Sequence, residues 1–134
     1  MNNIDLMKYW FESSDSDFDT MKVLFENHKN TWCLFIGHLV IEKLLKGLYA
    51  KNNPENPISP KIHNLILLSQ KANLEVTNEI KEKIQVINTF NISARYDDYK
   101  KTFEEKCTNE YTTLQFKNIE EVQKWLKKKK KKIF

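Results

Sequence analysis

One segment of the chain is almost entirely apolar, and it fixes the fold class. Residues 31–50 read TWCLFIGHLVIEKLLKGLYA, so a helix formed by them has large apolar side chains on nearly every side. Such a helix is buried on most of its surface, and other helices must surround it. Only two glycines and three prolines occur in 134 residues, which favours long helices with few turns. The segment therefore predicts the central helix of an all-α protein.

Three polar residues interrupt this apolar helix at regular spacing. His38, Glu42 and Lys46 stand at i, i+4 and i+8, so they form one polar stripe. An ionised group in a dry interior must be paired, shift its pKa or serve a function. The stripe therefore predicts polar partners on a neighbouring helix, a binding site, or both.

Apolar residues at spacings of three and four recur in other segments. They predict helices over residues 4–28, 62–72, 77–90 and roughly 112–126. Residues 96–107 have weak periodicity and predict an irregular connection or a short helix. Together these segments predict an all-α, up-and-down bundle of four to five helices.

Small polar residues near the predicted helix ends are candidate caps. Asn30 or Thr31 is expected to cap the apolar helix, Thr77 the fourth helix and Thr112 the last one. Ser14 stands in the apolar row of the first helix, where its small side chain would let a neighbouring helix approach closely.

The length predicts one domain, residues 1–126, followed by a lysine-rich helix end or tail, residues 127–134. Six consecutive lysines begin at Lys127, and without them the formal net charge of +4 becomes −2. A run of this kind attracts nucleic acid or anionic lipid. Alternatively, it is a solvated helix end whose charges suit the negative end of the helix dipole.

The composition favours a cytoplasmic protein without a membrane anchor. Cys33 and Cys107 lack the spacing of metal or redox motifs, which suits a reducing compartment. The chain opens without a secretory signal, and no apolar run approaches the ~18 residues needed to cross a bilayer. No glycine-rich phosphate loop, HExxH or CxxC motif occurs, and Asp97 and Asp98 lack a third suitably spaced ligand. We therefore expect no cofactor and no metal.

The single arginine points to a binding function. The chain has 21 lysines but one arginine, Arg95, which continues a polar row begun by Asn88 and Asn91. The planar guanidinium fits phosphate oxygens in a bidentate manner. The structural alternative is a buried Arg95–Glu42 ion pair that sets the register of the helices.

Four segments carry short motifs in a fixed order. They are YWFESSDSDFDTMKVLFE with Trp10, Ser14, Asp17 and Phe18; FIGHLVIEKLLKGLYAK with Glu42, Lys43 and Lys46; KIHNLILL after Pro60, with His63, Asn64 and Leu65; and INTFNISARYDDY with Ala94, Arg95, Tyr96 and Asp98. Over about residues 8–126, this pattern resembles the HEPN family of small helical bundles associated with nucleotides and RNA.

The resemblance implies a homodimer in which the second and fourth helices approach the partner subunit. Many HEPN proteins are metal-independent ribonucleases with an arginine and a histidine separated by four to six residues. Others are toxins silenced by a nucleotidyltransferase that modifies them, and still others bind nucleotides or serve as assembly domains.

This chain departs from the ribonuclease pattern, because no histidine follows Arg95. Lys100, Lys101 and Thr102 occupy the expected positions, and Thr102 also stands where some toxins have a modified tyrosine. A general base contributes typically 10²–10⁴-fold to a rate, so its absence argues against an enzyme. If the protein is a ribonuclease, Arg95 and His63 are the candidate catalytic residues.

The leading hypothesis is a homodimeric module that binds nucleotide or RNA, paired with a nucleotidyltransferase in a toxin–antitoxin-like system. The expected binding residues are Glu42, Lys43, Lys46, His63, Asn64, Arg95 and Tyr96. Each has a structural alternative: the lysines extend to the rim, His63 and Asn64 cap a helix, and Tyr96 packs against a loop. The competing functions are a degenerate metal-independent ribonuclease toxin and a dimerisation or adaptor domain without a ligand.

Overall fold

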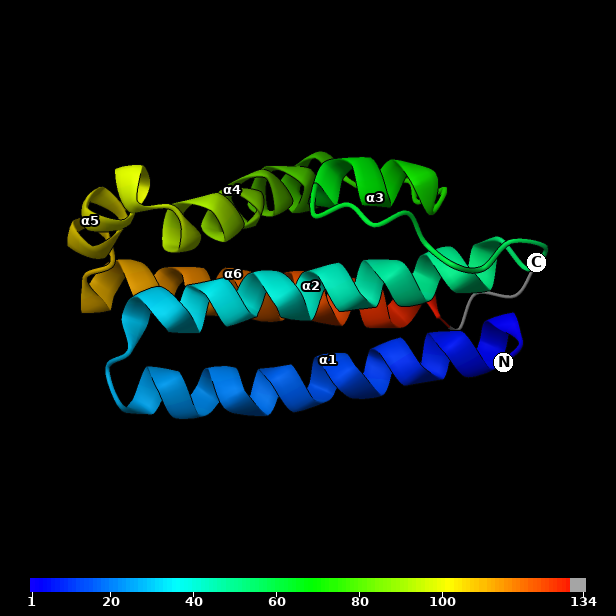
Figure 1. Ribbon diagram of the computed structural model, residues 1–134, viewed down its shortest axis with the longest axis horizontal. Helices are drawn as coiled ribbons and strands as arrows, with labels where there is room; N and C mark the ends of the chain where they lie inside the picture. The colour runs from blue at the N-terminus through cyan, green and yellow to red at the C-terminus, as the bar shows by residue number, and fades with distance from the viewer. Residues whose placement is uncertain (131–134) are drawn as a thin grey trace.

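The computed structural model describes residues 1–130, which form helices and connections without a strand (Figure 1). The six helices are α1 (Asn3–Glu26), α2 (Asn30–Asn52), α3 (Leu65–Lys71), α4 (Asn78–Arg95), α5 (Asp97–Lys106) and α6 (Asn109–Lys129). The all-α bundle is confirmed. It has more helices than the four to five predicted, because the weakly periodic segment after Arg95 forms the short helix α5.

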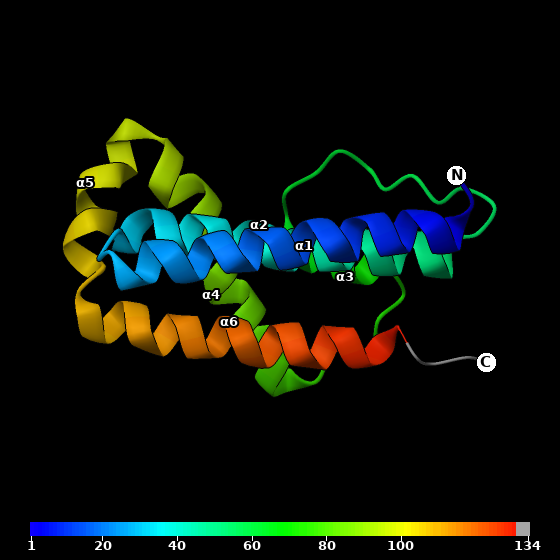
Figure 2. The same cartoon turned by 90° about the horizontal axis from the view of Figure 1, so that it is seen from below.

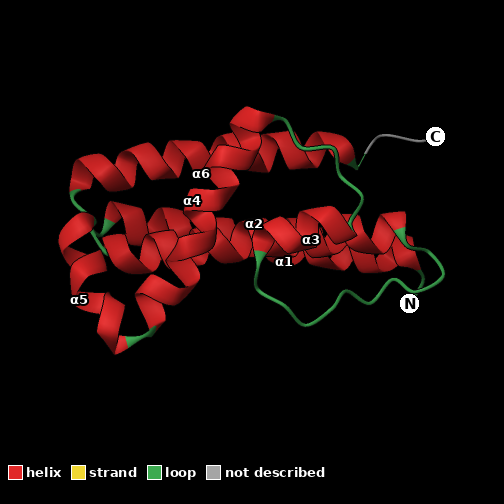
Figure 3. Cartoon of the chain, turned by 90° about the horizontal axis from the view of Figure 1, so that it is seen from above, coloured by secondary structure: helices red, strands yellow, loops and turns green. Residues whose placement is uncertain are grey.

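Helix α2 is the centre of the bundle. It contacts all five other helices, and its apolar side chains from Cys33 to Leu48 fill the core. Helices α1 and α6 run nearly parallel to its axis, whereas α4 crosses it obliquely (Figures 2 and 3). The predicted burial of residues 31–50 on most sides is therefore confirmed.

Small residues bring α1 and α2 close together. The buried Ser14 hydroxyl donates a hydrogen bond of 2.7 Å to the carbonyl oxygen of Val40. One end of the same contact is formed by Gly47, where a Cβ atom would lie 2.7 Å from two ring atoms of Phe11. The close approach predicted at Ser14 is confirmed.

Two polar side chains act as N-caps, Asn64 on α3 and Thr77 on α4. The Thr77 hydroxyl accepts a hydrogen bond of 3.3 Å from the amide of Ile80, as predicted. Helix α3 begins three residues later than predicted, because the Asn64 side chain accepts a hydrogen bond of 3.1 Å from the amide of Leu67.

The other predicted caps are wrong. Helix α6 is capped by Thr108, whose hydroxyl accepts from the amide of Tyr111 at 3.1 Å, and Thr112 lies fully buried inside the helix. Helix α2 begins after Lys29 without a side-chain cap. The Asn30 amide instead donates to the carbonyl oxygen of Cys107 at 3.0 Å. Tertiary hydrogen bonding thus takes up the side chain that the local pattern assigned to the cap.

The first lysines of the C-terminal run belong to α6, which extends to Lys129. Lys127 forms an ion pair with Asp15 at 2.6 Å, and Lys51 donates to the carbonyl oxygen of Lys129 at 3.0 Å. Residues 131–134 lie outside the described part of the chain, so a separate tail over residues 127–134 stays a prediction.

Candidate functional site

A buried carboxylate organises the polar stripe of α2. Glu42 is 4% exposed, and its two oxygens receive different partners. Oε1 lies 2.9 Å from Nδ1 of His63, and Oε2 lies 3.0 Å from Nζ of Lys46. The stripe was predicted to have partners on a neighbouring helix, but its partner is His63 in the connection that leads into α3, together with Lys46 from the stripe itself.

The contact with Glu42 fixes the tautomer of His63. A carboxylate accepts hydrogen bonds only, so Nδ1 of His63 carries the proton and donates a hydrogen bond to Glu42. In the neutral ring, Nε2 is then the basic nitrogen. The His63 side chain is 55% exposed, so a ligand can reach it. A histidine held in this way can accept a proton from a bound hydroxyl group.

His38 secures the same segment from inside the core. Its Nε2 donates a hydrogen bond of 3.2 Å to the backbone carbonyl oxygen of His63. Burial lowers the pKa of His38 to about 4, and the nearby Glu42 carboxylate opposes this shift without reversing it. The ring is therefore neutral at pH 7. Nδ1 is buried without a hydrogen-bond partner among the described residues, 3.7 Å from Oε1 of Glu42.

The predicted Arg95–Glu42 ion pair is wrong. Arg95 is exposed, and Nη1 lies 3.4 Å from the side-chain oxygen of Asn91. The reason is axial offset: Asn88 accepts a hydrogen bond of 2.8 Å from the amide of Leu65, which places the start of α3 level with Asn88. Arg95 lies seven residues further along α4, or about 10 Å along the helix axis. The two polar rows therefore do not satisfy each other.

The two rows nevertheless lie on one side of the molecule. The Arg95 side chain reaches back to Asn91, which lies three residues, or about 4.5 Å along the helix axis, beyond Asn88. Its guanidinium lies over the Phe35 ring of α2, with Cζ 5.9 Å from the ring centroid. Phe35 precedes His38 by three residues on the same helix. We call the residues His38, Glu42, His63, Asn88, Asn91 and Arg95 the α2–α4 face.

The two lysines among the predicted site residues form separate ion pairs. Lys43 forms an ion pair of 2.7 Å with Asp17 of α1, whereas Lys46 binds Glu42 and lies over the Trp10 ring at 5.3 Å. Trp10 and Asp17 are two turns apart on α1, so a phosphate clamp made by the two lysines is not formed.

Two other candidates have structural positions at helix ends. Asn64 caps α3, as its structural alternative proposed. Tyr96 joins α4 to α5, with its amide donating to the carbonyl oxygen of Ile92 at 3.2 Å, and its side chain is exposed. Tyr96 therefore remains available for stacking.

Two features of this region were not predicted from the sequence: the hydrogen bond that Asn88 makes and the exposure of Trp32. Asn88 was placed in a polar row, but its bond to Leu65 depends on how α3 docks on α4. Trp32 was counted among the core residues of α2, yet it is 45% exposed. Its position in the first turn of the helix, where neighbours cover less of the surface, is the signal that could have identified it.

Within residues 1–130, no three histidine, cysteine, aspartate or glutamate side chains are arranged to hold a metal ion. None of the described helices is long and apolar enough to cross a membrane. The α2–α4 face itself carries a guanidinium, an oriented imidazole, a carboxylate and amide side chains.

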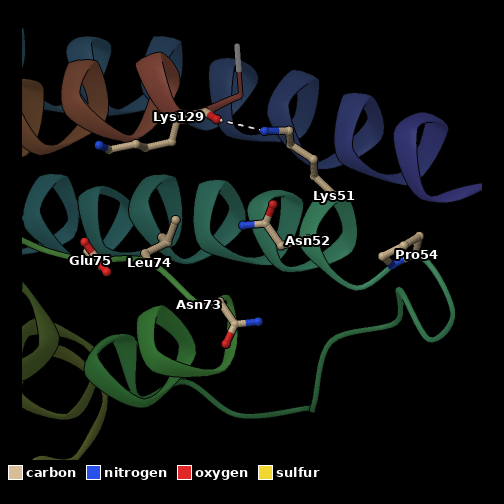
Figure 4. A pocket seen from close by; sticks show the side chains of 7 residues that line it. All are labelled: Lys51, Asn52, Pro54, Asn73, Leu74, Glu75 and Lys129. Atoms are coloured by element: carbon tan, nitrogen blue, oxygen red, sulfur yellow. Dashed lines mark hydrogen bonds between the residues drawn. The ribbon is translucent and has the colours of Figure 1, made fainter. Parts of the chain in front are cut away.

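A pocket of about 600 Å³ lies at the other end of the bundle (Figure 4). It is lined by the ends of α2 and α6 and by the α3–α4 connection, and Lys51 bonds across it to the carbonyl oxygen of Lys129. Lys51 follows Phe35 by 16 residues on α2, or about 24 Å. The pocket contains none of the predicted site residues and is separate from the α2–α4 face.

Comparison with known proteins identifies the family. A family model described as the HEPN domain matches residues 7–130. No curated protein matches the chain, and no solved structure does. The match covers most of the sequence and agrees with the helical bundle described above. The chain therefore belongs to the HEPN domain family, whose members are helical modules associated with nucleotides and RNA.

Proposed function

We propose that the protein is a homodimeric HEPN module that binds a nucleotide or RNA on the α2–α4 face and acts together with a nucleotidyltransferase. The observation that carries this proposal is the position of Arg95, the single arginine of the chain. Its guanidinium is exposed, lies over Phe35 and has no carboxylate partner within residues 1–130.

The guanidinium is available to bind an anion, because it makes little use of its donors within the protein. A single long hydrogen bond to Asn91 leaves most of its five N–H donors available. The Phe35 ring holds the planar group by a cation–π contact and restricts its motion. Bidentate donation to phosphate oxygens is the interaction that such a group makes best.

Exposed apolar side chains on neighbouring helices support the homodimer. Leu67 on α3 and Val86 and Ile92 on α4 are exposed, and Ile92 is the most exposed of the three at 50%. Burying these side chains against a second copy would remove apolar surface from water. It would also bring Arg95 of each subunit toward the partner.

Equilibrium binding tests the ligand part of the proposal. Fluorescence anisotropy at near-physiological salt should give saturable binding of labelled ATP, GTP or a 12-nucleotide RNA. Arg95→Ala should weaken binding about tenfold or more, as expected for losing a charge-assisted bond of roughly 1.5–3 kcal/mol, while its circular dichroism stays unchanged. Lys117→Ala removes an exposed cation from α6 and is the matched control. A folded wild-type dimer that binds none of these ligands would refute the proposal.

The nucleotidyltransferase partner needs a separate test. The protein should co-purify with a nucleotidyltransferase encoded beside it. Failure of the two proteins to form a complex would remove the partner from the proposal and leave ligand binding in place.

His63 favours a second candidate function, metal-independent cleavage of RNA. Its Nε2 would take the proton from a ribose 2′-hydroxyl, whose oxygen attacks the adjacent phosphorus and expels the 5′-oxygen, and the departing 5′-oxygen takes a proton from water. Arg95 would stabilise the negative charge that develops on the phosphoryl oxygens, and Glu42 would hold the imidazolium. The products are a 2′,3′-cyclic phosphate and a 5′-hydroxyl end.

Cleavage assays with EDTA present test this second function. Wild-type protein should cut RNA, His63→Ala should abolish cutting, and Glu42→Gln should lower the rate because His63 loses its charged partner. Cleavage that persists in His63→Ala would exclude His63 as the base.

A further inference from the structure

An exposed tryptophan stands beside Arg95 in the structure. Trp32 lies in the first turn of α2, and its ring packs edge-to-face on Phe35 with 5.7 Å between the centroids. Because Arg95 lies over Phe35, the guanidinium and the indole contact the same phenyl ring. Almost half of the Trp32 side chain remains open to solvent.

A second cation completes this cluster. Nζ of Lys100 lies 5.7 Å from the centroid of the Trp32 ring, so α5 contributes a charge to the same surface. The N-terminal part of α2, the end of α4 and the start of α5 meet here (Figures 1 and 2). We call Trp32, Phe35, Arg95 and Lys100 the Trp32 patch.

The spacing along α5 separates its two aspartates. Lys100 lies close in helical angle to Phe103, which is buried against Phe90 and so marks the inward side of α5. Asp98 lies on the other side of the helix, whereas Asp97 precedes Lys100 by three residues and lies on its side of the helix. The four residues of the patch themselves combine two aromatic rings with two positive charges.

We propose that the Trp32 patch is a stacking platform for single-stranded RNA, with a base on the exposed part of Trp32 and the flanking phosphates on Arg95 and Lys100. This inference rests on the proposed function, since it specifies the ligand of the α2–α4 face. Aromatic side chains bind bases of any sequence by stacking, and neighbouring cations follow the backbone.

The charges favour RNA over a second protein as the occupant. A lysine and an arginine sit against the rings themselves, whereas protein interfaces are depleted of lysine at their centre. Alternating rings and cations match the alternating bases and phosphates of a strand. One nucleotide cannot use both cations and the indole fully, so an oligonucleotide should bind more tightly than a mononucleotide.

Trp32→Leu is the decisive variant, measured by anisotropy with a fluorescein-labelled 12-nucleotide oligouridine and with a labelled ATP. Losing one stacked base should raise the Kd of the oligouridine roughly 5- to 150-fold and change the Kd of ATP much less. Trp32→Tyr should retain most of the affinity. Tyr9→Leu removes an exposed aromatic side chain from α1 and should leave the Kd unchanged.

Lys100→Gln provides a second test if the Trp32→Leu variant does not fold. It should reduce the slope of log Kd against log salt concentration by about 0.7, the value for one single-strand phosphate contact. An unchanged slope would overturn the inference.

The possible results separate the inference from the proposed function. If wild-type protein binds neither probe, the proposed function fails, and the inference fails with it. If Arg95→Ala weakens binding while Trp32→Leu and Tyr9→Leu bind equally well, ligand binding stands and the stacking platform is refuted. If Trp32→Leu converts a dimer into a monomer in light scattering, the patch is a subunit interface, and the inference is overturned.

Discussion

At the scale of single residues, the structure shows how an apolar helix accommodates charge. Glu42 lies in the core between Lys46, whose Nζ is 3.0 Å from Oε2, and His63, which donates a hydrogen bond to Oε1. Removing one partner of such a cluster leaves an unpaired charge in the low-dielectric interior. This costs more free energy of folding than the intact cluster contributes. The same contacts that stabilise Glu42 also orient the basic nitrogen of His63 toward solvent.

His38 makes a pH-dependent contribution to stability. Its pKa is about 4 in the folded protein, below the ordinary value of 6.5, because burial disfavours the charged ring. Between these two pH values the unfolded chain binds a proton that the folded chain does not. This contribution is therefore complete above pH 6.5 and is lost as the pH falls toward 4, by at most about 3 kcal/mol.

Denaturant unfolding of wild type and His38→Gln at several values between pH 7 and pH 4 measures this contribution. The wild-type free energy of unfolding should decrease by about 3 kcal/mol more than that of the variant, since glutamine does not titrate. Parallel curves for the two proteins would contradict the assignment of a neutral, buried His38.

At the scale of helices, glycine controls how closely α2 meets its neighbours. A Cβ on Gly47 would meet the Phe11 ring at 2.7 Å and the backbone oxygen of Met7 at 3.3 Å. A Cβ on Gly37 would meet the terminal methyl group of Ile119, which is the flexible end of a side chain. The helix α1 must move to relieve the first contact, whereas one rotamer change relieves the second.

Gly47→Ala should therefore destabilise the protein by about 1–3 kcal/mol, the usual cost of overpacking a core. Gly37→Ala should cost less, because a rotamer change of Ile119 relieves its clash, whereas the gain in helix propensity, up to about 1 kcal/mol, is the same for both variants. Thermal unfolding monitored by circular dichroism compares the two. Equal melting temperatures for the two variants would show that α1 is not held as closely to α2 as the structure indicates.

The same scale explains what could be predicted from the sequence. Burial of α2 follows from its composition, and the close contact at Ser14 follows from one small residue in an apolar row. Helical spacing correctly grouped Asn88, Asn91 and Arg95 on one face. Helical spacing gives no information on the axial offset between two helices, which is set here by α3 docking at Asn88. The Arg95–Glu42 pair failed for that reason.

At the scale of the whole molecule, the proposed homodimer requires apolar surface that a single chain leaves exposed. Ile92 projects from α4 beside Arg95 and is half exposed, as a subunit contact would require in the free chain. Ile92→Lys should convert the proposed homodimer into a monomer by placing a charge in the interface. Multi-angle light scattering measures this change.

Ile58→Lys is the control for that experiment, because Ile58 is an exposed isoleucine in the α2–α3 connection. It should remain a dimer. A wild-type monomer, or an Ile92→Lys variant that stays dimeric, would exclude an interface built on this part of α4.

The lysines of α6 offer the main competing surface for RNA. Lys124 and Lys128 are both exposed and one turn apart, so they could bind phosphates without any contribution from the α2–α4 face. Replacing both with glutamine should leave most of the affinity intact if the α2–α4 face is the binding site.

The salt dependence of RNA binding tests the α2–α4 face most directly. The slope of log Kd against log salt concentration should be measured for wild type, Arg95→Gln and the Lys124→Gln, Lys128→Gln double variant. Arg95→Gln should bind RNA more weakly, with a slope reduced by about 0.7, and the double variant should change little. An unchanged slope for Arg95→Gln, with a marked reduction in the double variant, would show that RNA binds to α6 and not to the α2–α4 face.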